Sequence, residues 1–461
     1  MENLSNKIDS SLDGLILDGH QKASKFQTNF TDVFFKRQWV QVLTLIAFGC
    51  IVYFPVFSHD FQSFWDDQWV VVNHYTEDGL EVKNLWSILS EFYKGQYAPV
   101  NQLYYSSLYQ LFDYNPFVFH TISLLLHVSN GILVYFLVGR LLSIQGIQDF
   151  STKLYTPLSF FAALIFIVHP VSVESVAWIS ASKILLYALF YFLGLIMYTF
   201  YIKKATAVCY LLTLGLFVLS FGGKEQAVTF PICLFLIDWL AERNFRDYKL
   251  YLEKLPFLLL AIFFGFVTLW SQSAVDQGML SGNVQYPIYQ RLVFACFAFT
   301  EYATKAFLPI KLSYIYPFPN QMFESLPLRF WFYPLVCIAV LWTFIKNFKR
   351  IWPTFLIAFF TLHIAITLHI IPISRFTITA DRYAYISLLP VCAIISYLFI
   401  KYFKRFKIPA LIIFFLYFGS LCIYTHQRSK VWRNTKTLKA EINEIIKSRG
   451  DYELLKKRIK H

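Results

Sequence analysis

The chain has 461 residues, of which 57% are hydrophobic and only 15% are charged. Soluble globular proteins carry about 25% charged residues, so this composition excludes an ordinary water-soluble domain. Several apolar runs approach the ~20 residues that a helix needs to cross a bilayer, and we predict an all-α polytopic membrane protein. The net charge of +13 does not indicate a nucleic-acid partner, because the basic residues form short clusters between the apolar runs.

In chain order, the apolar runs predict about eleven transmembrane helices. We expect them at residues 39–57, 117–139, 156–172, 184–201, 206–222, 227–241, 255–271, 331–347, 351–371, 383–400 and 408–425. Basic clusters follow alternate helices, as they do in cytoplasmic loops under the positive-inside rule. These clusters lie at 36–37, 203–204, 243–249, 346–350 and 401–407. The N-terminus is therefore expected in the cytoplasm and the C-terminus outside it.

This topology divides the chain into three parts. Residues 1–38 would form a cytoplasmic segment without the apolar stretch of a signal peptide, and residues 39–425 the transmembrane domain. Large outer loops are expected at 58–116 and 273–330. Residues 426–461 would form a short basic tail on the outer side, which we expect to be a solvated helix against lipid headgroups.

One apolar segment, residues 291–309, contains Arg291, Glu301 and Lys305. Counting it as a span would move the basic cluster 346–350 to the outer side. We therefore predict an interfacial or re-entrant helix within the outer region. Its charges would border a cavity, because charged groups at membrane depth are costly elsewhere.

Charged and polar residues gather at the outer ends of several predicted helices. The candidate site consists of Asp66, Asp67, His169, Glu174, Lys183, Lys224, Glu225, Arg375 and Arg382. They come from separate turns, yet the predicted topology puts all of them on one side of the membrane. Each acid could instead pair with a neighbouring base and only stabilise a helix end. For the whole set, a shared outer cavity is the stronger interpretation, since intramembrane and interfacial charges are usually functional.

This mixture of groups suits the transfer of a group from a lipid-linked phosphate to an acceptor hydroxyl. Cations can hold the phosphate and stabilise the charge that grows on it as it leaves. We assign this role to Lys183, Lys224, Arg375 and Arg382. A carboxylate can accept the proton of the hydroxyl. Asp66 or Asp67 would be this general base, with Asp66 preferred, while His169, Glu174 and Glu225 would shape the acceptor side.

Other polar residues and motifs favour different readings. Asp238 lies near the cytoplasmic end of its helix, where we expect local pairing. His120 and His127 share a helix face without an evident third ligand, so buried hydrogen bonding is predicted and no metal site. A divalent-ion requirement stays open. No nucleotide-binding loop or serine-hydrolase elbow is present, which disfavours an ATP-driven pump. A transporter remains an alternative, because charged cavities also bind substrates.

A set of short motifs runs along the chain in a fixed order. They are Trp65-Asp-Asp-Gln68, Tyr97-Ala-Pro-Val-Asn101, Asn115-Pro-Phe-Val-Phe-His120, Leu124-Leu-Leu-His-Val128, His169-Pro-Val-Ser-Val-Glu-Ser-Val-Ala-Trp178, Lys224-Glu-Gln-Ala-Val-Thr229, Asp238-Trp239, Ala380-Asp-Arg-Tyr-Ala-Tyr385 and Arg428-Ser-Lys-Val-Trp-Arg433. This set resembles the membrane domain of the transmembrane and tetratricopeptide-repeat O-mannosyltransferases and their bacterial relatives. The most specific stretches are 169–178 and 224–229.

The resemblance implies a GT-C glycosyltransferase fold. Enzymes of this kind use polyprenyl-phosphate sugars, often mannose, and add the sugar to protein hydroxyls outside the cytoplasm. They place a catalytic acid in the first outer loop, which corresponds to Asp66 and Asp67 here.

Three features depart from the family pattern. Ala98 stands where relatives usually carry an arginine, and Ile184 stands where they usually carry an acid. No tetratricopeptide repeat, which has a period of about 34 residues, fits after the last predicted helix. These departures concern donor binding, activity and acceptor choice.

The sequence therefore favours an inverting glycosyltransferase that moves mannose or another hexose from a polyprenyl-phosphate carrier to an outer acceptor, such as protein Ser or Thr hydroxyls. The first alternative is a catalytically silent membrane subunit or lipid-carrier-binding scaffold. The expected partners are the lipid carrier, a protein or glycan acceptor and a membrane protein. The expected location is a bacterial inner membrane, or the endoplasmic reticulum membrane in a eukaryote.

Overall fold

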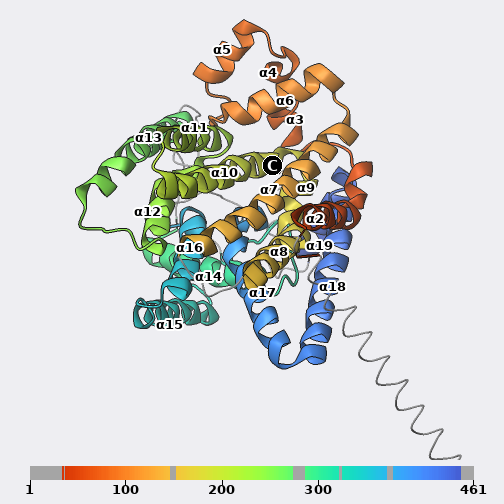
Figure 1. The fold of residues 1–461 in the computed structure, drawn as a ribbon. Coiled ribbons are helices and arrows are strands. Elements are labelled where there is room, and N and C mark those ends of the chain that lie inside the picture. Colours follow the sequence, from red (N-terminus) through yellow and green to blue (C-terminus); the bar gives the residue numbers. More distant parts are fainter. Residues whose placement is uncertain are drawn as a thin grey trace, which may run out of the picture.

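The computed structural model describes residues 34–35, 37–145, 152–273, 286–320, 324–370 and 377–447. Within these ranges the regular structure is helical, and β pairing is limited to one bridge between Tyr93 and Gln96. Figure 1 shows the helices packed into one bundle. The predicted class, an all-α membrane protein, is confirmed by these helices and by their apolar character.

Each apolar run predicted to span the membrane contains a helix. These helices are α2 (Gln38–Val52), α7 (Pro116–Ile144), α8 (Thr152–Val168), α10 (Ser182–Lys204), α11 (Ala207–Gly223), α12 (Phe230–Leu240), α13 (Tyr248–Ser273), α15 (Tyr333–Lys346), α16 (Ile351–Ile364), α17 (Leu388–Arg405) and α18 (Lys407–Val431). Among the described residues, 5 helices are long and apolar enough to cross a bilayer, or 6 if a bent pair counts as one span. The larger number of spans and the side of each terminus stay predictions.

The bent pair joins α8 to the short helix α9 (Val173–Ala177) at an angle of 50°. The bend lies at Pro170, which lacks a backbone N–H and opens the short 3-10 turn η2 (Pro170–Ser172). The His169 ring accepts a hydrogen bond from the Val171 N–H at 3.3 Å, which supports the turn. Residues 169–182 are buried, so this segment, predicted as an outer turn, lies inside the protein.

Helices α7, α8 and α10 form the centre of the bundle. Helix α7 packs along α8 and α10, and α10 also packs along α11. At Gly131 on α7, an added Cβ would lie 2.1 Å from the Ile167 side chain, so glycine allows this close approach. In contrast, Trp270 on α13 and Trp342 on α15 are exposed, as expected for helices that face lipid.

Four short helices fill the predicted outer loop 58–116. They are α3 (Asp67–Val70), α4 (His74–Glu77), α5 (Val82–Ser90) and α6 (Pro99–Phe112). Figure 1 shows α4, α5 and α6 together at the top edge of the bundle. The Tyr105 hydroxyl on α6 donates to the Ile179 carbonyl at 2.9 Å and lies 3.0 Å from Ser182 Oγ. These contacts hold the loop against the start of α10.

The charged apolar segment forms one helix, α14 (Ile288–Phe307), which is not among the helices apolar enough to span. Two of its charges, Glu301 and Lys305, pair within the helix. Lys305 Nζ lies 3.1 Å from Glu301 and 3.3 Å from the centre of the Tyr316 ring. The Ala306 carbonyl contacts the His169 ring, so the C-terminal end of α14 lies beside the bend of α8. An interfacial position in the membrane stays a prediction.

The described part of the basic tail forms helix α19 (Thr435–Lys447). Leu438 and Ile442 are buried against the bundle, and Arg428 on α18 forms an ion pair with Glu441. The tail is therefore helical as predicted, but one face packs on the protein. Its i, i+4 apolar pair is the sequence feature that anchors it.

Candidate functional site

Separate segments bring their charged residues together at the end of the bundle that carries α3–α6. The 3-10 turns η4 (Glu225–Thr229) and η7 (Asp381–Ala384) contribute two of these segments. Lys183, in the first turn of α10, is within electrostatic reach of four charged groups, namely Lys224, Glu225, Arg382 and Asp66. These five residues, which the sequence analysis expects on one side of the membrane, thus lie at one end of the bundle.

Asp67 is buried and forms hydrogen bonds to two separate segments of the chain. Its Oδ2 accepts a hydrogen bond from the Gln62 N–H at 2.8 Å. Its Oδ1 accepts one from the Ser180 N–H at 3.0 Å and another from the Ser180 hydroxyl. Burial raises the pKa of Asp67 to about 6, against the lowering effect of these hydrogen bonds. With both oxygens engaged, Asp67 joins the predicted outer loop 58–116 to the turn that precedes α10.

Asp66 has different surroundings from its neighbour. It is half-buried, and its Oδ1 accepts a hydrogen bond from Trp69 Nε1 at 3.3 Å. Within the described ranges, its Oδ2 has no hydrogen-bond partner. Asp66 therefore presents a carboxylate oxygen that can accept a proton, which Asp67 does not.

Lys224 and Glu225 form an ion pair of 2.9 Å at the turn after α11. The Lys224 side chain is largely buried, and its Nζ also lies 5.6 Å from the centre of the Tyr383 ring. Glu225 is 47% exposed, and the partial desolvation of its carboxylate acts to raise its pKa, but the ammonium groups of Lys224 and Lys183 outweigh this effect and lower it to about 2. Glu225 is therefore a charged counter-ion for the two lysines and a poor base at neutral pH.

Arg382 is held by the buried Glu174. Glu174 Oε2 accepts a hydrogen bond from the Arg382 N–H at 2.9 Å, and the other oxygen forms an ion pair with the guanidinium group. The guanidinium lies 5.4 Å from the centre of the Trp178 ring and 4.8 Å from that of Tyr383. The Arg382 side chain is 16% exposed.

An aromatic cluster forms a wall beside these charges. Trp178 and Trp432 stack at 5.4 Å with 18° between their planes. Tyr314 packs edge-on against both rings, at 5.5 Å from each. The Tyr314 hydroxyl accepts a hydrogen bond from Nε1 of Trp65 at 3.1 Å. Trp65 directly precedes Asp66 in the chain. Tyr314 also interacts electrostatically with Arg382, Asp66 and Glu174. Trp178 and Trp432 are buried, so this cluster packs behind the charges and supports them.

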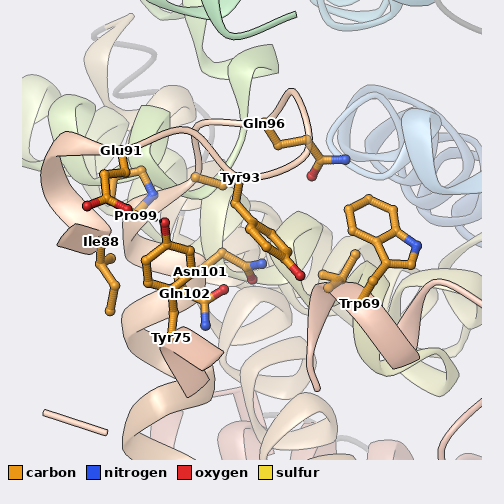
Figure 2. A pocket seen from close by; sticks show the side chains of 11 residues that line it. Trp69, Tyr75, Ile88, Glu91, Tyr93, Gln96, Pro99, Asn101 and Gln102 are labelled. Atoms are coloured by element: carbon orange, nitrogen blue, oxygen red, sulfur yellow. Dashed lines mark hydrogen bonds between the residues drawn. The ribbon is translucent and has the colours of Figure 1, made fainter. Parts of the chain in front are cut away.

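A small cavity adjoins the charged cluster on the side of the outer loop. Its lining includes Trp69, Tyr93, Gln96, Asn101 and Gln102, which Figure 2 shows together with their neighbours. Trp69 donates to Asp66, and Gln96 Oε1 accepts from Lys183 Nζ at 3.4 Å. The volume is about 50 Å³, which corresponds to space for a few water molecules. Asp66 and Lys183 therefore lie beside a small cavity lined by aromatic and amide side chains.

One predicted site residue that the structure describes, His169, does not join this cluster. His169 is fully buried, with Nδ1 bonded to the Val171 N–H and Nε2 lying 3.1 Å from the Ala306 carbonyl. One ring nitrogen contacts the bend after α8 and the other the end of α14, and a role on the acceptor side stays a prediction. Arg375 lies outside the described residues.

The two positions that depart from the family pattern lie in different surroundings. Ala98 lines the cavity beside Trp69 and Gln96, just before α6 begins. Ile184 is buried in the apolar core of the bundle. An arginine at position 98 would thus reach into the cavity, whereas an acid at position 184 would need a different packing of α10.

The opposite end of the bundle contains a second ionic cluster. Lys254 and Asp238 are both fully buried and form an ion pair, and Arg243 bridges Asp238 at 3.0 Å and Glu253 at 2.8 Å. The Tyr198 hydroxyl donates to Asp238 Oδ1. These contacts confirm the predicted local pairing of Asp238.

The predicted buried roles of two histidines are also confirmed. His127 Nδ1 lies 2.7 Å from the Tyr385 hydroxyl, and its Nε2 lies 2.8 Å from the Ile167 carbonyl. His120 is buried, with Nε2 lying 3.5 Å from the Asp60 carbonyl.

Several residues of the site were not identified from the sequence. Ser180 and Tyr314 carry no motif that marks them as partners of Asp67 and Trp65. Trp432 lies in the motif Arg428–Arg433, so the resemblance to a known family was the available signal for it. Their roles depend on contacts between segments far apart in the chain, which a single sequence does not display.

Comparison with known proteins finds a similarity of limited extent. The chain is 29% identical over 215 residues to Protein O-mannosyl-transferase F38B6.6 of Caenorhabditis elegans. The match covers 45% of this chain and 29% of that protein, so the chain corresponds to less than a third of its relative. No protein-family model matches the chain, and no solved structure matches it. The similarity supports a loose relationship to O-mannosyltransferases.

Proposed function

We propose that this chain is a membrane glycosyltransferase of inverting type. It moves mannose or another hexose from a polyprenyl-phosphate carrier to a Ser or Thr hydroxyl of a protein. The reaction takes place on the outer face of a bacterial inner membrane, or on the lumenal face of the endoplasmic reticulum membrane. The main support is the open carboxylate of Asp66 in the same cluster as Lys183, Lys224 and Arg382. The similarity to a protein named as an O-mannosyl-transferase supports the reaction class.

The proposed step is a single displacement at the anomeric carbon of the donor sugar. The acceptor hydroxyl oxygen forms a bond to that carbon while its proton passes to Asp66 Oδ2. The bond between the anomeric carbon and the phosphate oxygen breaks, and the phosphate keeps the electron pair. Lys183, Lys224 and Arg382 stabilise the resulting negative charge. Attack from the face opposite the leaving phosphate inverts the anomeric configuration.

The two aspartates have separate roles in this proposal. Asp66 is the general base, and Asp67 positions the loop through Gln62 and Ser180. Replacing Asp66 with Asn removes proton acceptance while keeping the size of the side chain. We expect transfer to fall by about two to four orders of magnitude.

The test uses purified full-length protein, a polyprenyl-phosphate-linked radioactive mannose and Ser/Thr-containing peptides. Asp78→Asn is the matched control, because Asp78 is exposed in the same outer loop. Wild-type turnover in Asp66→Asn would contradict the assignment of the base. Measured donor binding by both Asp66→Asn and wild type, with no transfer by either, would instead favour the carrier-binding scaffold. Proteoliposome flux of the sugar without covalent transfer would favour a transporter.

A further inference from the structure

A second polar pocket lies at the same end of the bundle, between the end of α2 and the end of α18. Its lining consists of Phe54, Pro55, Ser58, His59, His426, Lys430, Arg433 and Thr437. The cavity volume is about 480 Å³, within the usual range of small-ligand sites. None of these residues belongs to the proposed transfer site.

The basic side of this pocket has cations without counter-ions. Within the described ranges, neither Lys430 nor Arg433 has a carboxylate at ion-pair distance, and both side chains are exposed. The contrast with Arg428 is direct, because that residue is buried and paired with Glu441 on α19. Lys430 and Arg433 are therefore free to bind an anion, whereas Arg428 is a structural cation.

A buried histidine adds a second, independent feature. His59 is 2% exposed and lines the pocket, and neither of its ring nitrogens meets hydrogen-bond geometry with a described residue. The Ala177 backbone lies close to the ring. Burial, followed by the nearby Arg433 charge, lowers the pKa of His59 to about 4, so the ring is neutral at pH 7. A neutral imidazole can donate one N–H to an oxygen anion in the pocket.

The other side of the pocket is apolar and lies near the end of a long apolar helix. Phe54 is 66% exposed and packs against Phe57 with 6.0 Å between ring centres. Helix α18 has 25 residues, a length of about 37 Å, which is enough to cross the hydrocarbon core. Its last turn, with Lys430, is thus expected at headgroup depth. A ligand here would contact cations at one side and hydrocarbon at the other.

We propose that this pocket binds a phosphate group through Lys430, Arg433 and His59, and that an anionic glycerophospholipid supplies it. A phosphodiester matches the two cations and the imidazole donor, and the acyl chains would leave along Phe54. The same chemistry would accept inorganic phosphate, so the experiment compares the two sources. The proposal does not depend on glycosyl transfer.

One short segment, residues 430–433, connects this pocket to the proposed transfer site. The Gln62 amide donates to the Trp432 carbonyl at 2.7 Å, and the Asp60 N–H donates to the Arg433 carbonyl at 2.9 Å. Trp432 in turn stacks on Trp178, which lies beside Arg382. A bound phosphate would therefore brace the segment 430–433 against the loop that carries Asp66.

The test measures lipid binding to the purified full-length chain in detergent by native mass spectrometry. Phosphatidylglycerol, phosphatidylcholine and diacylglycerol are titrated separately, and inorganic phosphate is tested by calorimetry. We expect phosphatidylglycerol to bind most tightly, and Lys430→Gln/Arg433→Gln to weaken it by about tenfold or more. The control Lys436→Gln/Lys447→Gln removes the same charge from exposed positions on α19 that do not line the pocket, and should bind as wild type.

A second variant guards against a folding defect in the first. Ser58→Glu places a carboxylate at an exposed position of the pocket and should also weaken phosphatidylglycerol binding. If inorganic phosphate binds but lipid does not, and the pocket variants lose phosphate binding, the anion site is supported and its ligand is a soluble anion. Equal phosphatidylglycerol binding by wild type and both pocket variants, with no phosphate binding, would overturn the proposal.

Discussion

Ser180 donates two hydrogen bonds to one carboxylate oxygen of Asp67, through its backbone N–H at 3.0 Å and through its hydroxyl. The two residues are 113 positions apart in the chain. The contact ties the predicted outer loop 58–116, which carries Asp66, to the turn that leads into Lys183. Asp67 thereby sets the position of Asp66 relative to the cations.

Asp67→Asn should destabilise the fold. The Asn carbonyl can still accept from Ser180, but its NH₂ group would face the Gln62 N–H and leave that buried donor without an acceptor. Such a loss costs about 1–3 kcal/mol. Thermal unfolding of the purified protein should therefore show a lower midpoint for Asp67→Asn and an unchanged midpoint for Asp66→Asn. Equal midpoints for Asp67→Asn and wild type would contradict the connecting role.

The same carboxyl predicts a pH effect on stability. Its pKa in the folded protein is about 6, above the ordinary value of 3.8, because burial disfavours the charged form. The folded state therefore binds the proton more tightly, and this contribution to stability is present below about pH 4 and lost as pH rises through 6. The difference in unfolding midpoint, wild type minus Asp67→Asn, should decrease as the pH is raised from 4 to 6. A constant or rising difference would show that the folded-state pKa is not raised.

Glu174→Gln should weaken both the fold and the proposed activity. Glu174 is 4% exposed, and its loss as a carboxylate leaves the largely buried Arg382 guanidinium without its counter-ion. Breaking such a pair costs about 3 kcal/mol. A double-mutant cycle with Arg382→Gln, followed by unfolding, should give a coupling energy of at least about 1 kcal/mol. Additive effects of the two substitutions would show that the pair does not hold Arg382.

Lys183→Gln should raise the KM for the polyprenyl-phosphate donor by about tenfold or more, because it removes one cation from the phosphate site. Lys204→Gln, at the opposite end of the same helix, is exposed and serves as the matched control. Transfer kinetics with varied donor concentration separate KM from kcat. An unchanged KM in Lys183→Gln would remove this residue from the donor site, even if kcat fell.

Labelling should place the first outer loop and the turn after α11 on the same side of the membrane. Gln68 and Glu225 are exposed, and each can be replaced by Cys in a background without the seven native cysteines. A membrane-impermeant maleimide should label both from one side and a Cys at Lys204 from the other. Labelling of Gln68→Cys and Glu225→Cys from opposite sides would separate Asp66 from Lys224 and exclude a shared site.

Much of the local structure could be predicted from the sequence. Every predicted apolar run contains a helix, because side-chain hydrophobicity and helix length follow from consecutive residues. The predicted helix 156–172 was too long at its end, because α8 stops at Val168 just before Pro170, which has no N–H to donate. The number of spans was harder to predict, because helices such as α12, with 11 residues, are too short to cross a bilayer by length alone.

The sequence by itself determined that this is a helical membrane protein and which turns carry its charged residues. Only the tertiary structure decided which groups each charge contacts. Asp66 and Asp67 are neighbours of identical chemistry, yet Ser180 engages one and leaves the other open. His169 is a site candidate by sequence, but its ring contacts Val171 in the bend after α8 and Ala306 at the end of α14. A side chain's pKa and accessibility depend on the groups packed around it, and those groups come from segments far away in the chain.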